Sequence, residues 1–217
     1  MFENYAFSIF VFAAIIFVGG FAVGTQWNVR KGDRVLKWFR DGLPLIGERS
    51  TMRWLGSSVV ELKIQKAKDP FRNAETLVVL EPRDVLLLWA FFHARGRRDL
   101  LIFRAQLRTA PTFELEVFVP RAWTTQQTER DVKRKNWTRL ETFPPSFDAY
   151  YSGDGAEKIA NPIIDLAKRA GGQLVRLSVH RTVPNLEIHW ALPDLQTSSS
   201  RDLFTNLRRV AEEALRA

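Results

Sequence analysis

The sequence contains no cysteine among its 217 residues. This absence excludes disulfide bonds, catalysis by a thiol and metal sites built from thiolates. It does not identify a cellular compartment, because cysteine-free chains fit both oxidising and reducing surroundings. Stability must therefore come from a packed core, and any chemistry must come from other side chains.

The common catalytic patterns are missing as well. The sequence has no GxxxxGK[ST] loop, no GxGxxG at a helix start and no GxSxG elbow, so nucleotide binding and acyl transfer have no support. The three histidines, His93, His180 and His189, lie in different segments without the spacing of a metal site. We therefore expect a non-enzyme with no cofactor, no metal ion and no small-molecule substrate. An enzyme whose site is built from scattered polar residues is the alternative.

Apolar residues and positive charge are both plentiful. Hydrophobic residues make up 46% of the chain and charged residues 26%, which is typical of a folded protein rather than a disordered one. The formal net charge of +8 at pH 7 predicts attraction to polyanions such as ribosomal RNA or anionic lipid headgroups. Simple solubility, or the positive bias of a membrane-proximal domain, explains the same charge.

The longest apolar run lies between Tyr5 and Gly24 and contains no charged side chain. At about 1.5 Å per residue it is long enough to cross a hydrocarbon core of roughly 30 Å. Residues 1–24 are therefore predicted to form a single transmembrane anchor. Cleavage near Gly24 as a signal peptide is the alternative, although no Lys or Arg precedes the run. Gly19, Gly20 and Gly24 form a candidate contact face for another helix.

A basic juxtamembrane segment, residues 25–50, follows the anchor. Its Lys and Arg residues outnumber Asp33 and Asp41, which predicts an outside N-terminus and a cytoplasmic domain, at a cell membrane or a membrane of the endoplasmic-reticulum type. Apolar residues recur at helical spacing between Asp33 and Leu43, so this part is either an interfacial helix or a core helix beneath the domain. The predicted membrane-interface residues are Arg30, Lys31, Arg34, Lys37, Trp38 and Arg40.

The remaining sequence predicts an α+β fold. Residues 51–128 form a predicted first half, in which a hairpin connection is expected at residues 108–111. The apolar residues between Asp84, a candidate cap, and Gly96 predict a short buried helix. Runs rich in Val, Ile and Phe predict strands at residues 59–64, 76–80, 100–107 and 113–119.

A basic linker, residues 129–145, ends at Pro144-Pro145 and leads to a predicted second half, residues 146–217. The segments 108–120 and 181–193 are similar, each with a Pro-containing turn between apolar runs. We therefore predict two similar helix-strand-strand halves with antiparallel hairpins, and convergence of two edge hairpins is the alternative. The second half is predicted to contain strands at 147–151, 174–179 and 186–191 and helices at 156–170 and 201–215.

Two basic clusters are the clearest polar signals in the domain. Arginine can fork onto phosphate oxygens and an adjacent aromatic ring can stack, so such clusters suit contact with RNA or with lipid headgroups. A solvated loop with incidental charge is the alternative, because proximity to a membrane also favours Lys and Arg. The predicted ribosome- or anion-binding residues are Arg95, Arg97, Arg98, Arg130, Lys133, Arg134, Lys135, Trp137 and Arg139.

The order of these features resembles the calumin family, the coiled-coil-domain-containing membrane proteins of the PAT complex of the multipass translocon. The resemblance implies a spanning helix followed by a cytoplasmic α+β domain. The family's acidic luminal region and basic C-terminal coiled coil are not found in this sequence, so a ribosome contact would have to come from the two basic clusters. The similar segments are PRDVLLLW at 82–89, RRDLLIFRAQL at 97–107, FELEVFV at 113–119 and FDAYYSG at 147–153.

These expectations lead to two functional hypotheses. The first is a non-enzymatic accessory factor for insertion or folding of membrane proteins, with its anchor beside a translocon or insertase and its basic domain facing ribosomal RNA. The second is a membrane-tethered scaffold that binds anionic lipid or another envelope protein, without a link to translation.

Overall fold

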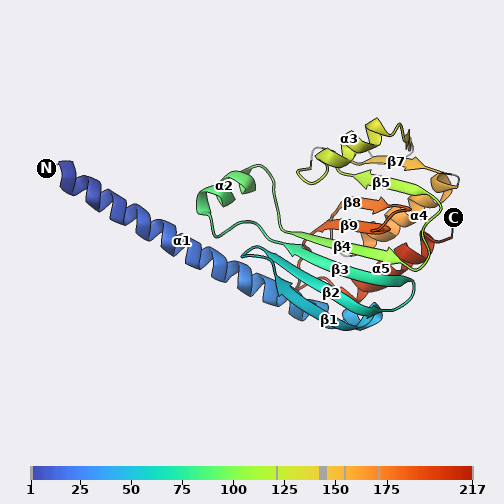
Figure 1. The fold of residues 1–217 in the computed structure, drawn as a ribbon, viewed down its shortest axis with the longest axis horizontal. Helices are drawn as coiled ribbons and strands as arrows, with labels where there is room; N and C mark the ends of the chain where they lie inside the picture. The colour runs from blue at the N-terminus through green and yellow to red at the C-terminus, as the bar shows by residue number, and fades with distance from the viewer. Residues whose placement is uncertain (1, 121, 142–145, 154, 171, 217) are drawn as a thin grey trace.

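The computed structural model describes residues 2–120, 122–141, 146–153, 155–170 and 172–216. Its fold is α+β, with one long N-terminal helix, α1, leading into a domain built on a nine-stranded antiparallel sheet. The N-terminal part of α1 projects far beyond this domain, whereas the end of the chain lies on the domain itself (Figure 1).

Helix α1 (Phe2–Phe39) is continuous from the apolar run into the domain. Its stretch Phe7–Phe39 contains a window with a mean hydropathy of 2.4, long and apolar enough to cross a membrane, a property that signal sequences share. The C-terminal part belongs to the core, because Val35 and Phe39 are fully buried. Of the two alternatives for residues 33–43, the core helix is therefore correct, and it is not separate from the apolar run.

One sheet joins all nine strands in the order β1-β2-β3-β4-β9-β8-β5-β7-β6. The predicted strands at 59–64, 76–80, 100–107, 113–119, 147–151, 174–179 and 186–191 are confirmed, with boundaries that differ by a few residues. The strands are β1 (Gly47–Trp54), β2 (Val59–Ala67), β3 (Phe71–Val79), β4 (Leu100–Leu107), β5 (Glu114–Phe118), β6 (Thr138–Arg139), β7 (Asp148–Ser152), β8 (Leu174–Val179) and β9 (Leu186–Ala191).

The expected hairpin at residues 108–111 is wrong. Strand β4 pairs with β3 and β9, whereas β5 pairs with β7 and β8. The connection therefore carries the chain across two intervening strands, and only the β8–β9 pair forms the second predicted hairpin. The division into two similar halves is not confirmed, because β5 lies among the strands of the second predicted half.

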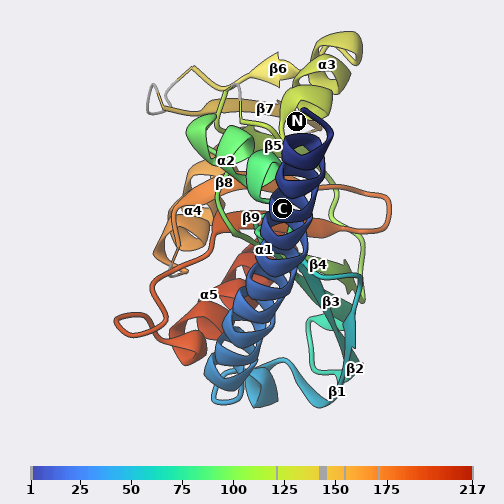
Figure 2. The ribbon, with the colours of Figure 1, turned by 90° about the vertical axis from the view of Figure 1, so that its left-hand side faces the viewer.

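Two helices and the end of α1 cover one face of the sheet. Helices α4 (Ala156–Arg169) and α5 (Ser200–Glu213) pack against each other and, with the end of α1, bury the apolar side of the strands (Figure 2). Their apolar residues recur at helical spacing, as in Ala160, Ile163 and Ala167 of α4, all buried. A one-turn 3₁₀ helix, η1 (Leu43–Leu45), lies between α1 and β1.

Two further helices lie away from this core. Helix α2 (Leu86–Ala94) confirms the predicted helix, but the prediction that it is buried is wrong, because none of its residues is buried. Its N-cap is Val85 rather than Asp84. Helix α3 (Gln126–Arg134) and strand β6 occupy much of the segment expected to be a linker. The Pro144-Pro145 break lies outside the described residues.

Candidate functional site at the junction of α1 and the domain

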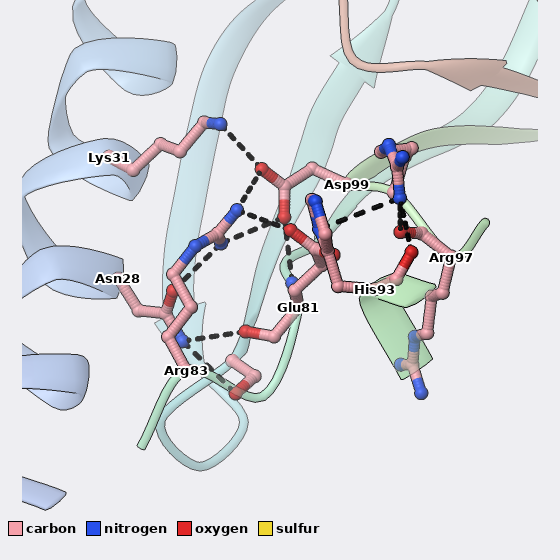
Figure 3. Close-up of polar contacts among 9 residues, drawn as sticks. Asn28, Lys31, Glu81, Arg83, His93, Arg97 and Asp99 are labelled. Carbon is pink, nitrogen blue, oxygen red and sulfur yellow. Dashed lines mark hydrogen bonds and ion pairs between the residues drawn. The ribbon is translucent and has the colours of Figure 1, made fainter. Parts of the chain in front are cut away.

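Three segments that are distant in sequence meet where α1 enters the domain (Figure 3). They are the C-terminal third of α1, the connection from β3 to α2, and the end of α2 with its connection to β4. Their polar side chains form one hydrogen-bonded group, which we call the junction cluster. Its members are Asn28, Lys31, Glu81, Arg83, His93 and Asp99.

Arg83 is the centre of the junction cluster. Its two terminal nitrogens donate to both carboxylate oxygens of Asp99, at 2.9 and 3.0 Å. Nη2 also donates to Oε2 of Glu81 at 2.7 Å, and Nη1 donates to Oδ1 of Asn28 at 3.1 Å. Two-pronged arginine–carboxylate pairs fix geometry as well as charge, so Arg83 holds all three segments in register.

The amide of Asn28 connects α1 to the loops. The side chain is fully buried, and Nδ2 donates to the backbone oxygen of Glu81 at 3.0 Å and to Oγ of Ser58 at 3.2 Å. One turn further along α1, Lys31 forms an ion pair with Asp99 at 2.5 Å. A buried amide with its oxygen and nitrogen both bonded stabilises the fold, whereas loss of one partner leaves a costly unpaired group.

The charges of the junction cluster balance one another. Lys31 and Arg83 are cations, and Glu81 and Asp99 are anions. Burial by itself would raise the pKa of Asp99, but hydrogen bonds from Arg83 and Lys31 and from the backbone N–H of Glu81 outweigh it and hold that pKa below its ordinary value. The aspartate therefore stays ionised, as a clamp and not as a proton donor.

This arrangement is suited to holding segments together. Each carboxylate oxygen of Asp99 already accepts a bond from Arg83, which leaves little capacity for proton transfer to a substrate. Within the described residues, no three His, Asp or Glu side chains gather as they would around a metal ion. The junction cluster therefore ties α1 to the connections on either side of α2.

Close packing extends the junction along α1 towards its N-terminus. The face of α1 at Gly24 lies against the backbone oxygen of Arg83, and Gly20 lies against the side chain of Leu86 at the start of α2. At Gly24, where the neighbour is backbone, only glycine allows such a close approach. The small-residue contact face predicted from Gly19, Gly20 and Gly24 thus has an intramolecular partner at two of its positions, and Gly19 has open space around it.

The first basic cluster lies at the C-terminal end of α2. The guanidinium carbon of Arg95 is 4.0 Å from the ring centroid of Phe91, and that of Arg97 is 4.3 Å from the ring centroid of Trp123. Arg98 donates to the backbone oxygen of His93 at 2.9 Å. Arg95 and Arg97 therefore present their guanidinium edges near α2, whereas Arg98 helps to end the helix.

The second basic cluster lies on and after α3, and most of its charges are already paired. Ion pairs join Lys133 to Glu129 at 2.7 Å, Arg134 to Asp131 at 3.0 Å and Arg139 to Asp148 at 2.8 Å. Lys135 lies 5.2 Å from the ring centroid of Trp137, and Arg130 is exposed. A polyanion would have to compete with these internal carboxylates.

The predicted membrane-interface residues divide into two groups. Arg30, Arg34 and Lys37 are exposed on α1, and Arg40 is exposed directly after it. Lys31 instead faces the junction cluster, and Trp38 faces the domain, where its indole N–H donates to the backbone oxygen of Ser198 at 2.8 Å.

A second charged network, which the sequence analysis missed, lies on the sheet face opposite α4. Arg176 links Glu116 at 2.9 Å to Glu187 at 3.4 Å, and Arg104 reaches Glu187 at 2.9 Å. Burial opposes the charge on Glu187, but His189 and the arginines lower its pKa to about 2. Polar residues at alternate positions of β4, β8 and β9 were the available signal.

Comparison with known proteins adds no relative to this picture. No protein-family model matches the chain, and no curated protein matches it. The resemblance to the calumin family therefore stays a prediction, and functional conclusions have to come from the geometry.

Proposed function

We propose that this protein is a non-enzymatic, membrane-tethered scaffold whose basic domain is held rigidly against the cytoplasmic face of the membrane that α1 spans. One observation carries the proposal. The helix that is exposed and apolar at Phe10 and Phe17 is the same unbroken helix that is fully buried in the domain core at Phe39. A single helix without a linker transmits its position directly to the domain.

The side chains around Gly24 support a membrane boundary at this level. Trp27 is 55% exposed, and amphipathic tryptophan is enriched where hydrocarbon meets the headgroups. Arg30 follows three residues later and is exposed. The junction cluster lies at the same level as Asn28 and Lys31, so its buried charges would sit just outside the hydrocarbon layer, where they cost least.

The contacts of α1 also favour an uncleaved helix. Leu86 packs against Gly20, and this contact would be lost if the chain were cut after Gly24. The positive residues that follow Gly24, set against the lone Glu3 before the apolar run, favour a cytoplasmic domain.

Membrane extraction and protease protection test this proposal together. Full-length protein carrying an N-terminal epitope should stay with membranes at alkaline pH, and in sealed inside-out vesicles protease should digest the domain and spare the epitope. Full extraction at alkaline pH, a mature chain that begins near Thr25, or a domain protected in inside-out vesicles would each refute it.

An accessory function in insertion or folding of membrane proteins is a second candidate, as the calumin resemblance implies. The observation that favours it is the pair of exposed cations Arg130 and Lys135, the second of which lies 5.2 Å from the ring centroid of the half-buried Trp137, because such side chains suit phosphate contact. It predicts co-sedimentation with ribosomes at low salt, loss of that binding in an Arg130→Gln/Lys135→Gln variant, and crosslinks from α1 to a translocon or insertase. Binding to anionic liposomes with indifference to ribosomes would favour the scaffold alone.

A further inference from the structure

Helix α2 has an apolar surface that the domain does not cover. Between Val85 and Ala94 the sequence is LLLWAFFH, with His93 as its one ionisable side chain. Leu87 is 87% exposed and Phe91 is 48% exposed. A helix that is apolar on all sides is expected inside a protein core or in lipid, not in water.

The position of α2 along α1 indicates its depth. Leu86 packs against Gly20, which lies one helical turn, or about 6 Å, before Gly24 along the axis of α1. Figure 1 shows α2 standing off the sheet and reaching towards the N-terminal half of α1. If Gly24 lies at the edge of the hydrocarbon layer, the start of α2 lies inside that layer.

We propose that α2 is a second membrane-inserted element, an in-plane helix sunk into the cytoplasmic leaflet beside α1, with Arg95 and Arg97 contacting anionic lipid headgroups. The inference rests on the proposed function, because the leaflet is that of the membrane that α1 spans. The occupant of the exposed face of α2 is therefore the acyl region of this leaflet.

Continuity with α1 argues for lipid as the occupant. The adjoining part of α1 is itself apolar and exposed, with Phe17 at 68% and Phe21 at 48% exposure. One hydrocarbon layer covers both helices at this depth, and in-plane helices bury an apolar face in this way.

The charged residues are arranged to match a headgroup layer. Arg95 and Arg97 lie at the end of α2 and stack on the rings of Phe91 and Trp123. Trp123 is 45% exposed, as expected for an aromatic ring at an interface. A guanidinium stacked by its face keeps its N–H edge free for phosphate oxygens.

The ends of α2 are fixed to the domain, so its depth is determined by α1. Arg83 in the junction cluster precedes α2, and Asp99 in the same cluster follows it. The depth of α2 therefore follows from the depth of Asn28 and Lys31 on α1.

The absence of cysteine allows a direct test with single labels. We would place cysteine at Ile15 in α1, at Leu87 in α2 and at the exposed Glu157 in α4, each in the full-length protein. An environment-sensitive fluorophore is attached to each, and the protein is reconstituted at high lipid-to-protein ratio in phosphatidylcholine vesicles with phosphatidylglycerol. Quenching is then compared between doxyl-labelled lipid and aqueous iodide.

The proposal predicts that the labels at Ile15 and Leu87 are quenched by doxyl lipid and the label at Glu157 by iodide. If Ile15 reports lipid and Leu87 reports water, the inference is wrong while the proposed function stands. If Ile15 also reports water, the proposed function is wrong. A Leu87 label shielded from both quenchers would indicate contact with a second copy and would overturn the lipid assignment.

Neutralising the arginines tests the headgroup contact separately. Replacing Arg95 and Arg97 by Gln should lower the fraction of Leu87 label that reports lipid in anionic vesicles, by about fivefold in the insertion equilibrium per arginine at low salt. Arg201→Gln is the matched control, because Arg201 is exposed on α5, far from α2. Equal quenching for all variants in anionic and uncharged vesicles would overturn the assignment of these arginines.

Discussion

Helices α2 and α4 are both rich in apolar residues, yet they have opposite surroundings. Helix α4 buries Ala156, Ala160, Ile163, Ile164 and Ala167 against the sheet, whereas α2 buries none of its residues. The difference lies in the pattern. In α4 the apolar residues form one stripe beside a polar face, and in α2 they surround the axis. A helix with one apolar stripe is expected to pack on a protein core. A helix that is apolar on all sides and lies away from the core is expected to have surroundings other than water.

The largest expected effect comes from placing a charge in each helix. Ile163→Asp puts an unpaired carboxylate where the native side chain is fully buried, so it should cost more than about 3 kcal/mol and prevent stable folding. Leu87→Asp should leave the free energy of unfolding in detergent within about 0.5 kcal/mol of the parent. Urea titration checks both. Equal destabilisation by the two changes would contradict the conclusion that the domain core covers α4 and not α2.

The second largest effect is expected at the junction cluster. Arg83→Met removes the cation shared by Asp99 and Glu81 while filling similar space, and the loss of this buried partner should cost about 3 kcal/mol. The loss should be seen in thermal unfolding and in faster hydrogen exchange of α2 than of α4. Arg208→Gln, which breaks an exposed pair with Glu212, is the control and should cost less than about 1 kcal/mol.

The sequence predicted elements well where the burial pattern was regular, as in β4 and α4. Prediction failed where a segment has no regular spacing of apolar residues. Strand β1 is an edge strand exposed along most of its length, and α3 has Val132 as its one large apolar residue, so neither shows the usual periodicity. The turn at Pro111 indicates a change of direction but not which strand is the next neighbour. Helix α2 was expected to be buried because its residues are apolar, but apolarity alone does not show whether the domain covers a helix.

Alanine substitutions at the three glycines of α1 should weaken the packing of α2 on α1 to different degrees. Gly24→Ala should destabilise the packing of α2 on α1 by about 2 kcal/mol, because the new methyl group would meet the backbone oxygen of Arg83. Gly20→Ala should cost less, since the Leu86 side chain can move, and Gly19→Ala should cost nothing. Thermal unfolding in detergent ranks the three variants. A similar cost at all three positions would contradict this packing.

The smallest effect is expected from pH. Because the pKa of Asp99 is lowered in the folded protein, its contribution to stability is present above the ordinary aspartate pKa and is lost as the pH falls through the folded value. A spin label at Leu87 should therefore become more mobile on acidification, and a label at Glu157 should change less. In an Asp99→Asn background the Leu87 label should show no such acid response. A persistent response there would assign it to another group.

The junction cluster itself could not have been found from local sequence. Asn28, Arg83 and Asp99 are far apart in the chain, and each alone looks like an ordinary surface or loop residue. The one hint in the sequence was Asn28, an uncharged polar residue between the apolar run and the basic residues that begin at Arg30. Contacts between distant segments depend on the sheet order, which the turn signals did not reveal.

The central claim is that α1 is one rigid helix from the bilayer to the domain core. A direct test is the distance distribution, by pulsed electron spin resonance in lipid nanodiscs, between labels at Phe12 in α1 and Glu157 in α4. The account predicts one narrow distribution that is the same in detergent and in lipid. A broad distribution, or two populations, would show that the helix breaks near Gly24 and would contradict the claim.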